Sequence, residues 1–236
     1  MRLDKFLADC GVGSRSEIKK IIKDGRVTAG GAVTKNAAAP VEETALVCLD
    51  GTPVVYRKFV YIMMNKPQGV VSATDDNVYP TVLSLLPKEY DHFDLFPCGR
   101  LDVDTEGFLL LTNDGQTAHK LLSPKYKRPK TYYARVTGAI PQNAPTLFAE
   151  GIDLGDFTTL PAKLQVLSVG ETSEATITIT EGKFHQVKKM FLSVGTPVVY
   201  LKRLSFAGLS LDPALSPGDF RELTAEETAV LCNPTK

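Results

Sequence analysis

Two carboxylates one residue apart, beside an arginine and just ahead of an apolar run, are the first side chains here that could do chemistry. In GRLDVDTEGFLLL, Asp102 and Asp104 follow Arg100 and precede the run FLLL. A run this short and continuous favours a buried strand, so the acids are expected where that strand begins. A carboxylate kept ionised by a nearby cation could act there as a nucleophile or remove a proton.

Two other interpretations of the acid pair remain open at this point. In one, an aspartate caps backbone amides in an Asx-type turn while Arg100 balances the other charge. In the other, both acids bind a metal ion, although the neighbouring residues offer no convincing further ligands. Because alternate residues of an extended segment point the same way, Asp102 and Asp104 are expected to face one side.

The composition is that of an ordinary globular protein. The 236 residues, 43% hydrophobic and 23% charged, suit one or two domains with a sizeable core. No apolar run approaches the roughly 20 residues that span a bilayer, and the N-terminus does not resemble a signal peptide. The four cysteines and three histidines are scattered, which favours free thiols in the cytoplasm over disulfides or a metal site.

The formal net charge is zero, but the charges are segregated along the chain. Residues 119–135 hold six Lys or Arg and residues 183–203 hold five, with no acid in either stretch. Residues 141–181 and 211–236 are net acidic. Because a local field acts over about 8 Å at physiological salt, such basic stretches can bind phosphates in a neutral protein.

The N-terminal residues predict a compact module of two helices and a hairpin. Ser14 and Glu17 have the spacing of a capping box, and Gly25 marks the end of the helix that they begin. VTAGGAVT then predicts two short strands joined at Gly30 and Gly31. Arg15, Lys19 and Lys23 fall four apart on one face of this second helix and form a column of cations, with Arg26 just past its end.

The remainder of the chain predicts an α+β fold on a mixed, mostly antiparallel sheet. YIMMNK, TYYARVTG and ATITITEG favour strands, and residues 115–123 and 185–195 have the pattern of amphipathic helices. No βαβ alternation appears. We therefore expect two domains, at residues 1–58 and 59–236.

The N-terminal segment resembles the small RNA-binding domain named for ribosomal protein S-four. RLDKFLA, SRSEIKKIIKDGRV and VTAGGAVT occur in that family's order over roughly residues 1–45. The resemblance implies that the second helix and the following loop track RNA phosphates. The cation column is then the expected RNA-binding surface.

The larger segment resembles the pseudouridine synthases. Four motifs occur in the order and spacing of that family: NKPQG, GRLD, KTYY and EGKFHQVKKMF. The chain is more similar to the branch that has GRLD at the position where another branch has HRLD. The match runs from about Tyr61 to Leu223. The resemblance implies an RNA isomerase that needs no cofactor, metal or energy source.

The same resemblance implies roles for single residues. Asp102 matches the catalytic aspartate, which attacks the ribose anomeric carbon or removes a neighbouring ribose proton. Tyr132 matches the active-site tyrosine that stacks on a flipped base, and Lys188 the cation that pairs with the aspartate. Arg100 is expected to meet the phosphate or the flipped nucleotide. Lys66 is expected to do the same or to support the fold.

Further stretches resemble the small-subunit member of that branch, which modifies uridine 516 of 16S rRNA. They include NKPQGVVSATDD and LDPALSPGDFREL. The implied substrate is rRNA in a partly assembled small subunit, and we expect a monomer that contacts no membrane. The alternatives are a synthase acting on 23S rRNA, a non-catalytic rRNA-binding assembly factor, and a metal-dependent nuclease.

Overall fold

The computed structural model describes residues 1–232, which separate into two compact units. One unit comprises Met1–Val60 and Leu86–Leu95, and the other comprises Tyr61–Leu85 and the chain from Phe96 onward. The return of residues 86–95 to the first unit was not anticipated.

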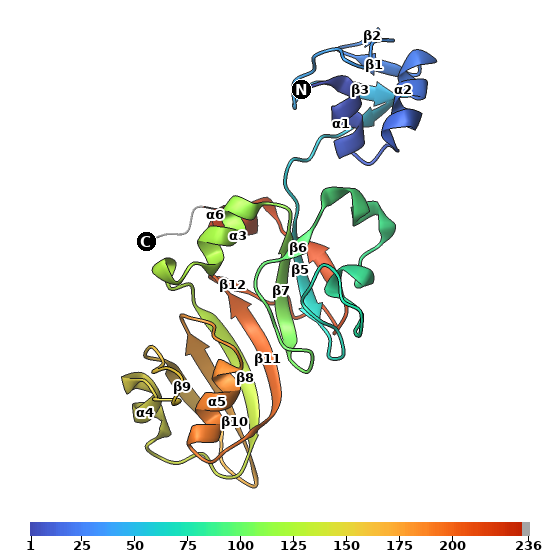
Figure 1. The fold of residues 1–236 in the computed structure, drawn as a ribbon. Helices are drawn as coiled ribbons and strands as arrows, with labels where there is room; N and C mark the ends of the chain where they lie inside the picture. The colour runs from blue at the N-terminus through green and yellow to red at the C-terminus, as the bar shows by residue number, and fades with distance from the viewer. Residues whose placement is uncertain (233–236) are drawn as a thin grey trace. The chain divides into compact units, whose positions relative to one another are not determined.

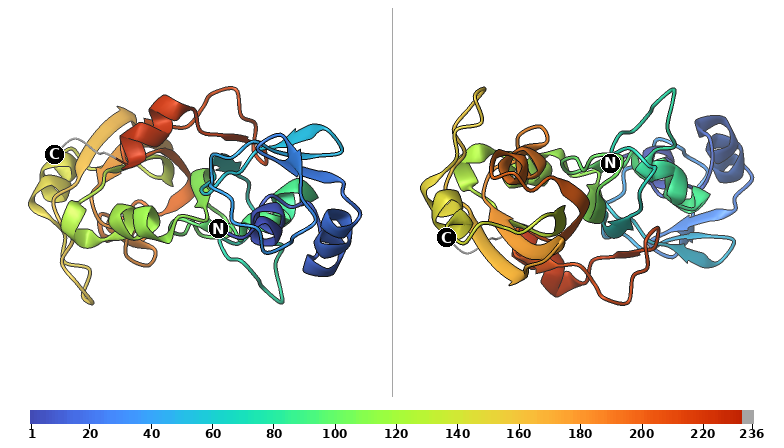
Figure 2. Two further views of the ribbon diagram at one scale, coloured as in Figure 1. Left: turned by 90° about the horizontal axis from the view of Figure 1, so that it is seen from above. Right: turned by 90° about the horizontal axis from the view of Figure 1, so that it is seen from below.

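The N-terminal unit packs helices on a small antiparallel sheet, and its residues 1–60 are shown in shades of blue in Figures 1 and 2. The sheet order is β2-β1-β3-β4. Its core combines the apolar faces of both helices with residues of the strands and of the segment between β2 and β3: Leu3, Phe6, Leu7, Ile18, Ile22, Val27, Val41 and Val47. The elements are α1 (Leu3–Asp9), α2 (Arg15–Lys23), β1 (Val27–Ala29), β2 (Ala32–Val33), β3 (Val47–Leu49), β4 (Thr52–Val54) and the 3-10 helix η2 (Lys88–Phe93).

Local signals in the sequence account for the elements of this unit. The predicted capping box is present at α2, where Ser14 and Glu17 bond each other's backbone amides and side chains. Gly30 and Gly31 both have positive φ angles, which the two-residue turn between β1 and β2 requires.

The larger unit is built on a nine-stranded sheet (Figure 1). Its main order is β13-β5-β7-β11-β8-β10-β9, with β6 paired to β7 and β12 to β11. The β7–β11 pair is parallel and the other described pairs are antiparallel, as the sequence predicted. The strands are β5 (Tyr61–Lys66), β6 (Phe96–Pro97), β7 (Glu106–Thr112), β8 (Lys130–Thr137), β9 (Lys163–Ser168), β10 (Thr172–Ile179), β11 (Val198–Phe206), β12 (Leu209–Ser210) and β13 (Phe220–Glu222).

Helices pack on the sheet in two groups. α3 and α6 contact each other and share a core with β5 and β7 that includes Tyr61, Phe108, Leu121 and Leu231. α4 and α5 meet through Phe148 and Phe191, whose ring centroids lie 5.3 Å apart. The remaining elements are η1 (Val82–Leu85), α3 (Gly115–Leu122), η3 (Pro124–Tyr126), α4 (Ala144–Glu150), α5 (Gln186–Ser193) and α6 (Ala225–Cys232).

Alternation along β8 buries one of its faces. Lys130, Tyr132, Ala134 and Val136 are buried, and the residues between them are half-buried or exposed.

None of the helices in residues 1–232 has the length and apolar character needed to cross a membrane. The four cysteines are free thiols, as expected.

Candidate active site

Lys66, at the end of β5, fixes the loop that carries Asp102. The Lys66 ammonium donates to the carbonyl oxygens of Pro67 at 2.9 Å, Asp102 at 3.0 Å and Thr105 at 2.9 Å. The Lys66 side chain is fully buried, and this burial lowers its pKa to about 8 against the opposing attraction of Asp104 and Asp102. Of the two roles expected for Lys66, these contacts support a part in the fold and leave its ammonium no route to a phosphate.

A second contact fixes the same loop from its other side. The Ser72 hydroxyl donates to the carbonyl of Leu101 and accepts from the Leu101 amide, both at 3.0 Å. The Thr105 amide closes a turn on the carbonyl of Asp102 at 3.1 Å. A local turn and two residues distant in the sequence, Lys66 and Ser72, therefore fix the backbone around Asp102.

Both carboxylates of the motif reach one cation on α5. The Lys188 ammonium lies 3.0 Å from Asp102 and 2.6 Å from Asp104. Burial alone would lower the pKa of Lys188, but its hydrogen bonds with Asp104 and Asp102 outweigh that effect and raise the pKa. His185 adds a ring nitrogen 3.6 Å from Asp102. The cluster brings together residues more than eighty positions apart.

The ion pair is partly exposed to solvent. The side chain of Asp102 is 30% exposed and that of Lys188 is 24% exposed, whereas Asp104 is 62% exposed. The cation beside Asp102 is therefore half-buried, because both groups lie at the opening of a cavity.

That cavity has a volume of about 280 Å³ and lies within the larger unit. Asp102, Lys188, Tyr132 and Arg100 all line it, so four of the predicted site residues come together. Arg100 is exposed and Tyr132 is buried. Apolar side chains complete the wall: Leu101, Leu122, Leu160, Ile179, Val187 and Leu201.

Of the adjacent tyrosines Tyr132 and Tyr133, which alternate along β8, only Tyr132 lines this cavity. Tyr133 packs edge-on against Tyr200, with ring centroids 6.0 Å apart. Tyr132 instead lines the cavity, paired across the sheet with Arg203 of β11 and Ile177 of β10.

Three further cavity residues were not singled out from the sequence: Lys130, His185 and Arg203. Lys130 and Arg203 were counted only within the two basic stretches. A signal was present, because Lys130 lies two residues before Tyr132 in a strand and therefore on its face. Arg203 likewise lies two residues after Leu201, which also lines the cavity, on the same face of its strand. His185 has a positive φ of 53° just before α5, which no local pattern announces.

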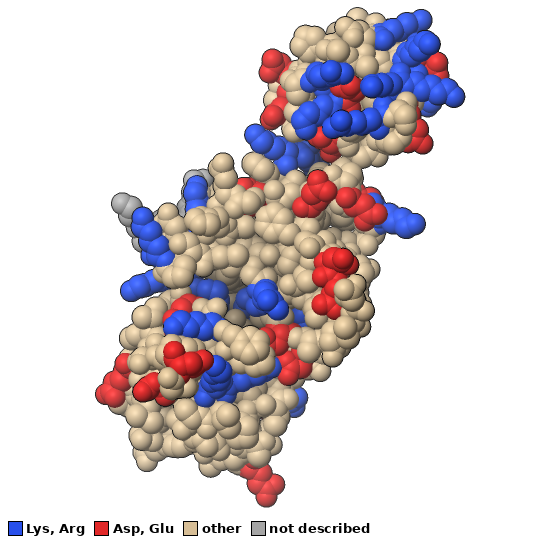
Figure 3. Space-filling view, viewed as in Figure 1, with Lys and Arg blue, Asp and Glu red and all other residues tan. Residues whose placement is uncertain are grey.

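The expected cation column lies on the exposed face of α2. Arg15, Lys19 and Lys23 are exposed and have no ion pair or hydrogen bond with another described side chain. Figure 3 shows Lys and Arg side chains clustered over this unit. Arg26 differs from these three, because it forms a bidentate ion pair with Asp50.

Within residues 1–232, no three or more His, Cys, Asp or Glu side chains are grouped so that they could hold a metal ion. The cavity contains two carboxylates, Asp102 and Glu181. Glu181 already accepts from the Leu160 amide at 2.8 Å and the Gln186 side chain at 2.7 Å. Asp102 is therefore the carboxylate best placed to meet a ligand.

Comparisons with known proteins support the family that the motifs indicated. The family model for RNA pseudouridylate synthase matches residues 60–193, and that for the S4 (S-four) domain matches residues 1–47. An uncharacterised RNA pseudouridine synthase of Bacillus subtilis is 51% identical, over 99% of each chain. A ribosomal small subunit pseudouridine synthase A of Vibrio cholerae is 43% identical, over 97% of this chain and 98% of its own.

A solved structure extends the agreement to three dimensions. The crystal structure of a pseudouridylate synthase is 36% identical and superposes with a TM-score of 0.69, covering 98% of this chain and 99% of that one. The resemblance seen in the motifs is therefore shared by the whole fold. The chain belongs to the RNA pseudouridylate synthase family and is an RNA isomerase with an N-terminal S4 domain.

Proposed function

We propose that this enzyme converts one uridine of 16S rRNA, of the uridine-516 class, to pseudouridine, with Asp102 as the catalytic carboxylate. One observation carries the proposal: the Asp102 carboxylate lies at a cavity mouth, 3.0 Å from Lys188, with Tyr132 on the cavity wall. A cavity of about 280 Å³ is small for a binding pocket and suits a single nucleoside.

In the proposed reaction a uridine leaves its stack and enters the cavity, as bases do in enzymes that act on them. Asp102 attacks the anomeric carbon or removes a neighbouring ribose proton, and the bond from that carbon to N1 of uracil breaks. The freed base turns and rejoins the sugar through C5. The proton on C5 is lost and N1 gains one, so the product is an isomer.

The neighbouring side chains have separate parts in this scheme. The Lys188 ammonium stabilises the ionised form of Asp102. The Tyr132 ring stacks on the base, and its hydroxyl assists removal of the C5 proton. Arg100, exposed at the cavity, binds the phosphate or the flipped nucleotide.

Support for the target comes from relatives that match over nearly their full length. The Vibrio cholerae relative is named as acting on the small ribosomal subunit. We extend this to the present chain and propose that the monomeric protein acts in the cytoplasm on rRNA in a partly assembled small subunit. Residues 1–58 then serve as the RNA-binding domain and residues 59–236 as the catalytic domain.

The test maps pseudouridine by carbodiimide modification on rRNA from cells lacking this gene. The cells are rescued by the wild type, by Asp102→Asn or by Asp104→Asn. Each variant removes one of the two negative charges that pair with Lys188, but Asp104 is 62% exposed and does not line the cavity. We expect loss of one small-subunit site, restored by the wild type and Asp104→Asn and not by Asp102→Asn.

Other outcomes identify the alternatives. A lost site in 23S rRNA would keep the chemistry and replace the target. Restoration by Asp102→Asn would remove this residue from catalysis. If the purified enzyme cleaved RNA and a chelator stopped it, the nuclease alternative would be favoured. If no site changed, a non-catalytic assembly factor would explain the chain better.

A further inference from the structure

Two buried cations lie at the inner end of the cavity, and no described carboxylate contacts either one directly. Glu181, on the cavity wall, attracts Lys130 only from beyond ion-pair distance. Arg203 is 2% exposed and Lys130 is 8% exposed, and both line the cavity. Within residues 1–232, no acidic group lies within ion-pair distance of either one. An unpaired buried charge is costly, so a fold that keeps two of them adjacent has a use for them.

Their hydrogen bonds within the protein are incomplete. The Arg203 Nε donates to the carbonyl of Phe108 at 2.6 Å, but its Nη2 is buried with no partner. The Lys130 ammonium donates to the carbonyl of Arg128 at 3.1 Å. Both cations lie near the ring of Phe206, with centroid distances of 5.1 Å for Arg203 and 5.7 Å for Lys130. A ring face offsets only part of the burial cost.

The sheet register places these donors beside the tyrosine proposed to stack on the base. Arg203 pairs with Tyr132 across β8 and β11, and Lys130 lies two residues before Tyr132 on the same face. A base lying against the Tyr132 ring would therefore present one edge to the two cations. A phosphate would stay outside, because these groups are nearly inaccessible and Arg100 is exposed.

The chemistry of uracil fits such an end wall. The ring carries two exocyclic carbonyl oxygens, and ammonium and guanidinium groups are hydrogen-bond donors only. When the bond to the sugar breaks heterolytically, its electron pair remains on N1 and the negative charge spreads to those oxygens. Donors positioned in a low-dielectric cavity stabilise developing charge far better than water does.

We propose that Lys130 and Arg203 form the base-reading end of the cavity, where they donate to the exocyclic oxygens of uracil and stabilise the charge of the detached base. This inference rests on the proposed reaction and adds two catalytic residues to it. It also explains a preference for uracil, because the amino group of cytosine would meet only donors.

The first test is Lys130→Met, which keeps the length of the side chain and removes its charge. We expect kcat/KM to fall roughly 100-fold, as on loss of one charge-stabilising donor. The free energy of unfolding at pH 7 should not fall, because the variant no longer buries an unpaired charge. Lys163→Met, on exposed β9, is the matched control and should change neither quantity. Unchanged activity with reduced stability in Lys130→Met would assign a structural role and overturn the proposal.

The second test asks whether the contact reaches the base. Single-turnover rates are compared for the wild type and Lys130→Met on one RNA with uridine, 2-thiouridine or 4-thiouridine at its target, since sulfur is the weaker acceptor. Arg203→Lys is examined in the same way. We expect sulfur at one of the two uracil positions to lower the rate of the wild type. In the variant that lacks the cation contacting this position, the same sulfur should lower the rate no further. If the losses from the protein change and from sulfur were additive at both positions, the proposal would be overturned.

A binding measurement separates this inference from the choice of RNA target. Free uracil is titrated into the wild type, Lys130→Met and Lys163→Met by nuclear magnetic resonance. Weaker binding to Lys130→Met alone would support the base-reading role even if the 16S target proved wrong. Equal affinity for all three proteins would reject that role whatever the target.

Discussion

The ammonium of Lys188 lies 3.0 Å from Asp102, and the same nitrogen lies 2.6 Å from Asp104. One cation on α5 therefore serves two carboxylates with very different surroundings. Asp102 lines the cavity, whereas Asp104 is mostly exposed. The pairing tests the proposed mechanism because the two neighbours can be changed separately.

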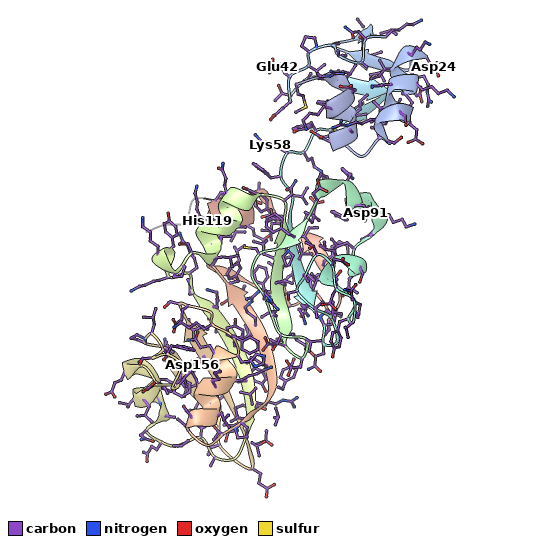
Figure 4. All side chains as sticks on the ribbon, viewed as in Figure 1. Asp24, Glu42, Lys58, Asp91, His119 and Asp156 are labelled. Atoms are coloured by element: carbon purple, nitrogen blue, oxygen red, sulfur yellow. The ribbon has the colours of Figure 1, made fainter. Side chains whose placement is uncertain are left out.

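Replacing Lys188 with Met should damage catalysis more than stability. We expect kcat to fall roughly 100-fold through loss of the charge beside Asp102. The free energy of unfolding should fall by about 1 kcal/mol or less, since both partners are partly exposed. Lys189→Met is the control, because Lys189 pairs at 2.6 Å with surface residue Asp156, labelled in Figure 4. Full activity in Lys188→Met would contradict the pairing model.

Gly107 should tolerate no side chain, because β7 and β11 approach each other closely there. It has a φ of 105°, and a Cβ would overlap the backbone of Arg203. We expect Gly107→Ala to lower the free energy of unfolding by about 2–4 kcal/mol, measured by urea titration. Gly138→Ala shares the positive φ but has open space around it, so its loss should be about 1–2 kcal/mol. Equal losses would show that the close approach contributes nothing.

The stability contributed by Lys130 should depend on pH. Burial, followed by repulsion from Arg203, lowers the pKa of Lys130 to about 8, below its unfolded value of 10.5. Below pH 8 both states are protonated and the penalty is fully present. Between pH 8 and 10.5 the unfolded state binds more protons than the folded state. The free energy of unfolding therefore rises with pH in this range, by at most ~1.4 kcal/mol per pH unit.

The stability advantage of Lys130→Met over the wild type should therefore shrink as the pH rises. Urea unfolding of both proteins at pH 7.5, 8.5 and 9.5 measures this difference. The comparison cancels most contributions from other groups, which the two proteins share. A difference that stays constant over this range would mean that Lys130 is not held in a charge-disfavouring site.

Removing the cation column of α2 should weaken RNA binding and flatten its salt dependence. Phosphate contacts release counterions, so log K falls as log salt rises. A triple change of Arg15, Lys19 and Lys23 to Gln should make this negative slope shallower by roughly 2. The control changes three other exposed lysines to Gln: Lys5, Lys88 and Lys163. If the two triple variants gave the same slope, α2 would not belong to the RNA-binding surface. Arg26 should contribute less, because Asp50 already binds it.

Local features of the chain were predictable because short-range interactions decide them. The capping box of α2 joins residues three apart, and the turn at Gly30 and Gly31 depends on backbone freedom at two positions. The strand at residues 106–112 follows from a short continuous apolar run, and the amphipathic α5 follows from helical periodicity. The family, and with it the candidate roles of Asp102, Tyr132 and Lys188, could be read from motifs.

The tertiary structure decided which charges meet and which are buried. Lys66 reaches the carbonyl oxygens of Asp102 and Thr105 because β5 pairs with β7, and Lys188 contacts both acids because α5 lies at the cavity mouth. Lys130 and Arg203 lie seventy-three positions apart in sequence, on strands that pair. Nothing local distinguishes them from solvated cations, since the energy of a charge depends on partners and exposure that only the assembled sheet supplies.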